Sequence, residues 1–390
     1  MNIIFYRYNS ICEPDYIDAF KRLGVDVIED MDGTDISLDV GVKITKLGNM
    51  IAEKRPLFIF SINFFPFLSI LCQRLGIIYV AVSVDCPVFE IYHSSIKNSV
   101  NRVFLFDRKQ YLSVRDENPN CIFHLPLGAA CERTSSLLGD EYDPEYDVSF
   151  IGSLYLEKDL FADLKLDKKD KNRFVVLMEK TIKSSASGFE YLENSLTSND
   201  EKIIKRAAKD FYPSEGSIMN MDHFVVLNDY MAPHMAYLER VDLLNDLGKS
   251  LEDAKVHLFT RSDTSKISKN VVLHGGVRSL EEMPFVFRNS RINLNISLRS
   301  IQTGLPQRIW DVLACRGFLL TNAQDEICDY FTPGVHLETY SNKEELKEKI
   351  RYYLDHDDER ERIAQNGFDE VMNKHTVLMR VMTMVKTIMS

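Results

Sequence analysis

The feature that most constrains the fold is a regular alternation, over the first 130 residues, of short unbroken apolar runs with segments of helical periodicity. Apolar runs that are not interleaved with polar residues are typical of parallel strands buried on both faces of a sheet. The pattern therefore predicts a doubly wound α/β domain. We expect strands near 2–7, 25–29, 57–62, 77–84, 102–106 and 121–125, and helices near 13–22, 42–53, 64–75 and 107–116.

A second series of the same kind begins with "DVSFIGS" at 147–153, after a polar connection that contains Gly and Pro. It is interrupted from 156 to about 235, where Lys, Asp and Glu are frequent and strand signals are almost absent, so we expect a helical insertion there. The alternation then resumes. Further strands are expected at 255–260, 270–275, 291–297 and 317–321, and helices at 234–248, 279–289, 306–315, 342–355, 358–373 and 376–389.

Two doubly wound domains in tandem place the carboxyl ends of two sheets on either side of a central cleft, which is where ligands bind in such folds. We expect an N-terminal Rossmann-like domain over 1–130 and a C-terminal Rossmann-like domain over 131–375 that carries the insertion at about 156–235. A C-terminal helix over 376–390 is expected to pack back toward the N-terminal domain.

Composition excludes several classes of function. The net charge of −11 argues against nucleic acid as a partner, because counterion release needs a basic face. The most apolar stretch, 56–76, is interrupted by Asn63 and Pro66, which argues against stable membrane insertion. The chain begins without a basic region ahead of an apolar one, so we expect a cytoplasmic protein. The seven cysteines show no metal-ligand spacing, and no metal site is expected.

The stretch "TGLPQRIWDVLACRGFLL" at 303–320 places two charged residues in an otherwise apolar segment. Pro306 suits the start of a helix, and a helix N-terminus favours anions. Arg308 in the first turn could bind phosphate, and Asp311 one turn later could accept hydrogen bonds from two vicinal hydroxyls. The alternative is an ion pair between Arg308 and Asp311, which lie three residues apart on one helical face. The neighbouring Gly304 favours the ligand.

Other candidates each have a structural alternative. Asp85 and Asp107 follow strands, at the edge where binding or catalytic carboxylates lie, but either could cap a helix. His375 is interpreted as a helix-boundary residue. Small residues after strands could admit a phosphate or a flat base, or could form ordinary turns. These small residues are Gly152 and Ser153 in "FIGS", and Gly275 and Gly276 in "LHGGVRS".

Several stretches together resemble the CgeB-like, spore-maturation type family of GT-B glycosyltransferases. They include "SVDCP", "NRVFLFDRKQYLSVR" with "FHLPLGAA", "YDVSFIGSLY", "RINLNIS" followed by "GLPQRIWDVLACRGFLLT", and the closing helices with "KHT". The resemblance spans most of the chain except the insertion at about 156–235. It implies a GT-B fold with the N-terminal domain, 1–130, on the acceptor side and the C-terminal domain, 131–375, binding the nucleotide-sugar donor. In that domain, Asp311 would hold the ribose. Thr303 stands where many related enzymes carry Glu, and Arg316 replaces a usual Gly.

The resemblance implies a metal-independent glycosyltransferase of hexosyltransferase type, without a cofactor, that moves a sugar from a nucleotide-diphosphate sugar, UDP-sugar foremost, to a protein or glycan acceptor with retention. The alternatives are a non-catalytic nucleotide-sugar-binding partner subunit, a two-lobed solute-binding protein and a nucleotide-sugar epimerase of GT-B shape. The insertion is the candidate for acceptor recognition, and a dimer is possible. The expected catalytic residues are Arg308 and Asp85, and the expected donor-binding residues are Gly152, Ser153, Gly275, Gly276, Asn295, Thr303, Gly304, Arg308 and Asp311.

Overall fold

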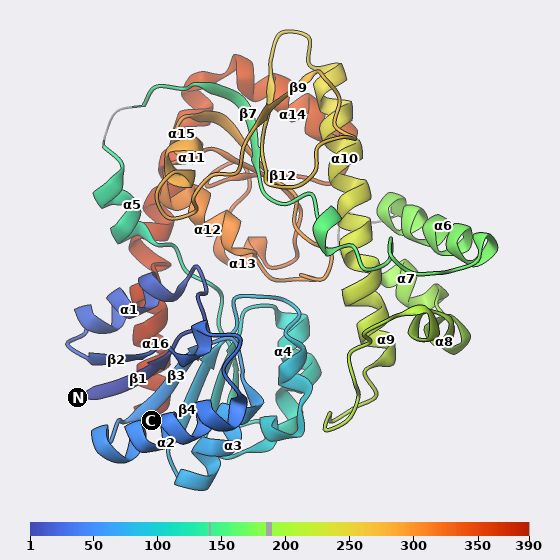
Figure 1. Ribbon diagram of the computed structural model, residues 1–390. Coiled ribbons are helices and arrows are strands. Elements are labelled where there is room, and N and C mark those ends of the chain that lie inside the picture. Colours follow the sequence, from blue (N-terminus) through green and yellow to red (C-terminus); the bar gives the residue numbers. More distant parts are fainter. Residues whose placement is uncertain (140–141, 185–188, 390) are drawn as a thin grey trace.

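Two six-stranded parallel sheets organise the chain in the computed structural model, which describes residues 1–139, 142–184 and 189–389 (Figure 1). The first sheet has the strand order β2-β1-β3-β4-β5-β6. Its strands are β1 (Asn2–Tyr6), β2 (Asp26–Asp30), β3 (Phe58–Ile62), β4 (Ile78–Val82), β5 (Asn101–Leu105) and β6 (Ile122–His124). Every residue of β3 is buried, because helices cover both faces of the sheet.

The helices of the first domain begin where the sequence supplies helix-starting residues. They are α1 (Glu13–Arg22), α2 (Val40–Lys54), α3 (Pro66–Leu75) and α4 (Arg108–Val114). In α1, a proline occupies the first turn, where its missing N–H costs nothing. The carboxylate of Glu13, fully buried, accepts the backbone N–H groups of Tyr8 at 2.8 Å and Ser10 at 3.1 Å. This carboxylate therefore fixes the loop that joins β1 to α1.

The second sheet has the strand order β12-β11-β10-β7-β8-β9. Its strands are β7 (Tyr146–Ile151), β8 (Val256–Phe259), β9 (Val271–His274), β10 (Ser290–Asn295), β11 (Leu319–Asn322) and β12 (Glu338–Tyr340). Its helices are α10 (Ala232–Ser250), α11 (Met283–Arg288), α12 (Gln307–Ala314), α13 (Ile327–Tyr330), α14 (Lys343–Asp355) and α15 (Asp357–Lys374). The strand order reverses between β7 and β10, so the end of β10 lies at the topological switch point.

The insertion leaves the second domain after β7 but packs against the first. It contains α6 (Lys168–Ser184), α7 (Glu190–Ser195), α8 (Ser198–Ala207), α9 (Asp222–Val225) and a π-helical turn (Val226–Met231) that continues into α10. One hydrophobic cluster joins its apolar residues to the core of the first domain. The ring of Phe89 lies 5.0 Å from that of Tyr212 and 5.3 Å from that of Phe224. The N–H of Ile218 donates to Tyr92 O at 2.7 Å.

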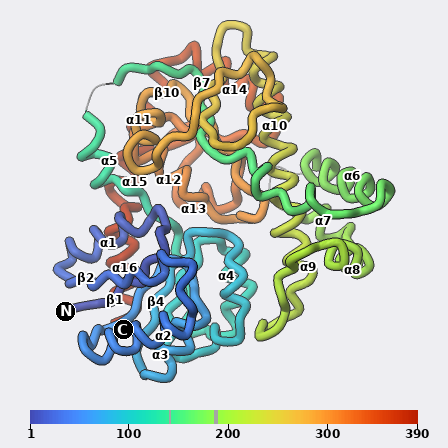
Figure 2. The backbone as a smooth tube through the Cα atoms, viewed as in Figure 1, coloured from blue at the N-terminus to red at the C-terminus, as the bar shows by residue number. Residues whose placement is uncertain are grey.

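Two chain segments cross between the domains side by side. The first leads from β6 into α5 (Cys131–Leu137), and the second joins α15 to α16 (Val377–Met389). Ala129 N–H donates to His375 O at 2.9 Å, and Val377 N–H donates to Ala129 O at 3.0 Å. A Cβ atom on Gly128 would lie 2.9 Å from Val377 N, so this close crossing requires glycine. After the crossing, α16 returns to the first domain and packs against α1 (Figure 2).

The predicted fold class, two doubly wound α/β domains with a helical insertion, is confirmed. Differences concern short elements. Strand β12 has three residues and was not predicted, and the predicted helix at 279–289 is shortened to α11. Among the described residues, no helix is long and apolar enough to cross a membrane.

Candidate functional site

Helix α12 presents the two charged residues that the sequence singled out. Its inward face is Ile309, Trp310, Val312, Leu313 and Ala314, all buried in a cluster of the second domain. Gln307, Arg308 and Asp311 lie on the opposite, half-buried face. The amphipathic spacing therefore turns the polar side of α12 toward the space between the domains.

A small pocket between the domains collects this polar face. Its volume is about 180 Å³. It is closed by the loop that leads into α1, by the start of α5 and by α11. The lining residues are Ile11, Cys12, Asp15, Arg133, Thr134, Ser279, Leu280, Met283, Pro284, Phe287, Gln307, Arg308, Asp311 and Cys315. Arg308 and Asp311 thus share one interdomain pocket.

The Arg308 guanidinium is positioned in this pocket by a thioether and an aromatic ring rather than by a carboxylate. Its Nη1 lies 2.7 Å from Met283 Sδ, and its guanidinium lies over the Phe287 ring at 5.0 Å. Burial lowers the pKa of Arg308, and Asp311 opposes this shift. Among the described residues no direct ion pair forms between Arg308 and any carboxylate, Asp311 included, so the ion-pair alternative is not realised. The Arg308 guanidinium is therefore available to bind an anionic ligand such as a phosphate group.

Asp311 is tied to the crossing between the domains. Gln307 Nε2 donates to Asp311 Oδ1 at 2.9 Å and to Gly128 O at 3.0 Å. Burial raises the pKa of Asp311, and Arg308, Gln307 and Arg133 act in the opposite direction. Gln307 therefore fixes the carboxylate while leaving its second oxygen available to a ligand.

Arg133 and Asp15 belong to the pocket but were missed by sequence reasoning. Arg133 donates to both carboxylate oxygens of Asp15, at 2.8 and 3.1 Å, and to Leu280 O at 3.2 Å. The bidentate pair links α1 to α5, and the contact with Leu280 adds the turn that precedes α11. The two residues are 118 positions apart, and neither lies in a motif, so no local signal marks the pair.

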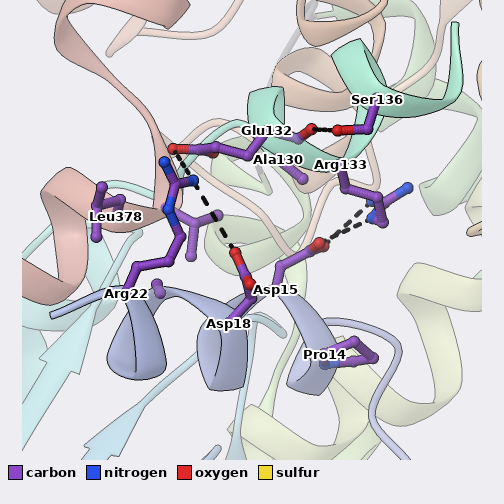
Figure 3. Close-up of a pocket in the computed structure, with 11 residues that line it drawn as sticks. Pro14, Asp15, Asp18, Arg22, Ala130, Glu132, Arg133, Ser136 and Leu378 are labelled. Atoms are coloured by element: carbon purple, nitrogen blue, oxygen red, sulfur yellow. Dashed lines mark hydrogen bonds and ion pairs between the residues drawn. The ribbon is translucent and has the colours of Figure 1, made fainter. Parts of the chain in front are cut away.

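A larger pocket of about 610 Å³ adjoins this pair, between α1, α5 and α16 (Figure 3). Its charged side chains are satisfied among themselves. Arg22 lies 2.9 Å from Glu132 and 4.0 Å from Asp18, and Arg133 is paired with Asp15. Because each charge already has a partner, the smaller pocket with Arg308 is the better candidate for an anionic ligand.

The loop before α12 touches the first domain directly. Asp107, almost fully buried, accepts the N–H groups of Thr303 at 2.8 Å and Gly304 at 2.9 Å. It also caps α4 by accepting Gln110 N–H at 2.8 Å. In return, Glu326 of the second domain accepts Arg108 N–H at 2.8 Å. Asp107 thus fulfils the expected capping role and, in addition, joins the domains.

Asp85 lies exposed at the end of β4 and caps no helix, because the next short helix begins after Val88 without a side-chain cap. Asn63 Nδ2 donates to Asp85 Oδ2 at 2.7 Å and to Tyr8 Oη at 2.9 Å. The carboxylates of Asp311 and Asp85 both act to raise the pKa of the Cys12 thiol, whose shift is due first to burial. Cys12 also lines the smaller pocket with Asp311, whereas Asp85 lies outside its lining.

Comparison with known proteins agrees with this architecture. Residues 240–386 match the family described as glycosyl transferase-like. Similar solved structures include a glycosyltransferase from Rickettsia africae, with TM-score 0.53, 12% identity, and 100% of this chain and 98% of that chain covered. Another is Anabaena HepE in complex with UDP and glucose, with TM-score 0.53, 10% identity and 100% of both chains covered.

Sucrose-phosphate synthase from Thermosynechococcus elongatus is also similar, with TM-score 0.56, 9% identity, and 100% of this chain and 99% of that chain covered. The chain has a GT-B fold. No curated protein matches it in sequence.

The remaining predicted donor residues of this GT-B protein lie at the carboxyl edge of the second sheet, outside the lining of the smaller pocket. Ser153 Oγ contacts Glu157 at 2.5 Å, and the Gly152 N–H donates to Phe259 O at 3.0 Å. Asn295 Nδ2 donates to Thr321 Oγ1 at 2.9 Å. Gly275 has open space where a Cβ would lie, whereas Gly276 is covered by the Arg261 side chain.

Arg316 occupies a left-handed conformation, with φ of 54°, at the end of α12 in this GT-B chain. Glycine adopts that conformation without strain, which explains the usual residue there. The Arg316 guanidinium lies over the Phe368 ring at 4.5 Å. Among the described residues, no group of three or more His, Cys, Asp or Glu side chains is placed to hold a metal ion.

Proposed function

We propose that this protein is a CgeB-like, metal-independent, retaining glycosyltransferase of hexosyltransferase type that transfers a sugar from a UDP-sugar to a glycan or protein acceptor in the cytoplasm. The GT-B fold and the matched segment at 240–386 support the reaction class. Anabaena HepE, of the same fold, has been crystallised with UDP-glucose. The observation that carries the proposal is the guanidinium of Arg308, held without a carboxylate partner among the described residues.

The donor diphosphate would bind at Arg308 and the N-terminus of α12. The free N–H groups of the first helical turn and the guanidinium both favour negative charge. Charge accumulates on the diphosphate as the bond to the anomeric carbon breaks. A preorganised cation at that point stabilises the transition state, and losing such a group costs about 2.7–4 kcal/mol.

Asp311 would hold the ribose. Its Oδ1 already accepts Gln307 Nε2 at 2.9 Å, so its position is fixed before the ligand arrives. The second oxygen can accept a hydrogen bond from a ribose hydroxyl, as acidic residues do in dinucleotide-binding domains. The carboxylate is one methylene shorter than the glutamate of related enzymes, and it lines the smaller pocket directly.

Asp85 would orient the acceptor. Its Oδ2 accepts Asn63 Nδ2 at 2.7 Å, and its Oδ1 can accept the acceptor hydroxyl. In the transfer step the bond between the anomeric carbon and the diphosphate oxygen breaks, and the bond to the acceptor oxygen forms. The hydroxyl proton leaves on the departing diphosphate, so no additional base is needed.

The domains would have to separate for the donor to enter. The pocket volume of about 180 Å³ is smaller than the roughly 300–1,000 Å³ of ordinary small-molecule sites. Asp107 also occupies the N–H groups of Thr303 and Gly304. The structure therefore represents a closed state of the two domains. Donor entry would require the contacts of Asp107 with Thr303 and Gly304 to break.

The test is Arg308→Ala in the full chain. We expect loss of UDP-sugar hydrolysis and transfer with an unchanged melting temperature, because the guanidinium makes no buried ion pair that folding requires. Arg362→Ala, at an exposed arginine paired with Glu359 on α15, is the matched control and should retain full activity. An Arg308→Ala protein with wild-type turnover would remove the diphosphate role.

A second candidate function, a non-catalytic nucleotide-sugar-binding subunit, is favoured by the closed contacts of Asp107 and by Thr303 at the position of a usual glutamate. Hydrolysis of a UDP-sugar in the absence of an acceptor distinguishes the glycosyltransferase from the non-catalytic subunit. A protein that is stabilised by UDP-sugars but releases no UDP over long incubation would be the binding subunit.

A further inference from the structure

The carboxyl edge of the first sheet carries a row of polar and aromatic residues that the donor site does not use. The strand order β2-β1-β3-β4 places four strand ends side by side. Asp30 ends β2 and Tyr6 ends β1, while Asn63 follows β3 and Asp85 lies three residues beyond β4. Ligands of open α/β sheets bind outside this edge.

Asn63 organises the part of the row nearest the cleft. It adopts a left-handed conformation, with φ of 57°, which Asn tolerates better than most residues. Its side-chain amide donates to Asp85 Oδ2 and Tyr8 Oη at 2.7 and 2.9 Å and accepts Val84 N–H at 3.1 Å. The amide is therefore fully engaged, and Asp85 Oδ1 has no hydrogen-bond partner among the described residues.

Aromatic rings form a ledge beside Asn63. The Phe65 ring lies edge-on to Tyr8 and Tyr6, each at 5.3 Å, and 5.9 Å from the Phe67 ring. Tyr8, Phe65 and Phe67 are half-buried, whereas Tyr6 is buried beneath them. Interlocked rings of this kind are rigid, and they present apolar faces next to a carboxylate and an amide.

Asp30 lies at the far end of the row, and only one of its two carboxylate oxygens has a hydrogen-bond partner among the described residues. It is 3% exposed, its Oδ1 accepts Asp32 N–H at 3.1 Å, and its buried Oδ2 has no hydrogen-bond partner among the described residues. Burial raises the pKa of Asp30, as expected for a carboxyl without a counter-charge in contact. Because this oxygen has almost no exposed surface, a ligand could reach it only if the surrounding chain moved, so Asp30 is not part of the site proposed below.

We propose that this edge is the acceptor site and that the acceptor is an uncharged saccharide. The inference rests on the proposed glycosyltransferase function and names its acceptor class. Sugar rings offer apolar C–H faces that fit the ledge of Tyr8, Phe65 and Phe67, and hydroxyls that suit the exposed carboxylate of Asp85. The exposed carboxylate of Asp85 at this edge disfavours phosphorylated or uronic-acid sugars, because like charges repel.

The test measures saccharide binding by the full chain, using saturation-transfer NMR and calorimetry. The probes are cellobiose, lactose and N,N′-diacetylchitobiose, with glucuronic acid as the anionic comparison. We expect at least one neutral disaccharide to bind and glucuronic acid not to bind. Binding should weaken at least tenfold in Phe65→Ala and in Asn63→Gly, which keeps the left-handed backbone without strain. The control is Tyr352→Ala, which removes a ring that is 45% exposed on α14 and should bind as wild type does.

Three outcomes would overturn the acceptor site: no neutral probe binds, both variants bind as wild type does, or only an unglycosylated peptide competes for the edge. UDP binding is measured in the same samples and should be equal in all variants. Saccharide binding without any stabilisation by UDP-sugars would retain the saccharide site but refute the glycosyltransferase. Stabilisation by UDP-sugars without saccharide binding would retain the proposed glycosyltransferase function but refute the saccharide site.

Discussion

Asp107 and Gly304 hold the two domains together across the cleft. The carboxylate of Asp107 accepts the Gly304 N–H at 2.9 Å, and a Cβ atom on Gly304 would lie 2.8 Å from Asp107 Cα and 2.9 Å from Phe106 O. The contact is thus possible only for glycine. Because Gly304 lies just ahead of α12, closure of the domains and the position of Arg308 are set by the same loop.

Gly304→Ala should prevent full closure. The added methyl meets backbone atoms of the first domain, which cannot give way as a flexible side chain would. We expect a larger radius of gyration by small-angle X-ray scattering and a loss of turnover, with UDP binding retained. Gly48→Ala in α2 is the control, because nothing lies within 4 Å of its added methyl. An unchanged radius and unchanged turnover would show that this contact does not govern closure.

Asp311→Asn should weaken binding of UDP and of the intact UDP-sugar by similar factors, because the ribose is common to both. Loss of one hydrogen bond to a charged group costs roughly 1.5–3 kcal/mol, or about 10- to 150-fold in the dissociation constant. Calorimetry with both ligands measures this. A defect confined to the sugar-bearing donor would place Asp311 against the sugar instead.

Asp229→Asn should stabilise the protein more at pH 8 than at pH 5. Burial, and then the nearby Glu90, raise the pKa of Asp229 from 3.8 to about 6. The unfolded chain ionises above its ordinary pKa while the folded chain keeps the proton until about pH 6, so this group lowers stability as pH rises through that window. Thermal unfolding at both pH values provides the test. An equal effect of Asp229→Asn at both would mean that Asp229 has an ordinary pKa.

Phe224→Ala should release the insertion from the first domain. Phe224 contacts the rings of Phe89 at 5.3 Å and Tyr92 at 4.8 Å. It is half-buried, so we expect a loss of about 1–3 kcal/mol, below the ~3–5 kcal/mol of a fully buried phenylalanine. The measurements are thermal stability and the rate of proteolytic cleavage within 208–222, with Phe285→Ala, at a residue 44% exposed on α11, as control.

If the insertion recognises the acceptor, Phe224→Ala should also reduce transfer while donor hydrolysis continues. A protein that is cleaved faster but transfers at the wild-type rate would exclude the insertion from the reaction.

The sequence predicted the sheets because unbroken apolar runs such as Phe58–Ile62 leave no other placement than a covered parallel strand. It also marked Arg308 and Asp311, since charges stand out in an apolar helix. Strand β12 is too short to give a periodic signal. Partners remote in sequence, such as Arg133 with Asp15 and Asn63 with Asp85, are brought together only by the topology, so pattern reasoning could not find them.

The attachment of the insertion to the first domain constrains how the molecule can move. Helix α5, which follows the crossing at Gly128, lies on one side of the molecule, and α9 of the insertion, which contacts Phe89 through Phe224, lies on the other (Figure 1). Opening the domains by a hinge at the chain crossing alone would break the contact between Phe89 and the insertion. A rotation about the line that joins the two attachments is the motion that would preserve both, and the π-helical turn at Val226–Met231 lies at the attachment of the insertion.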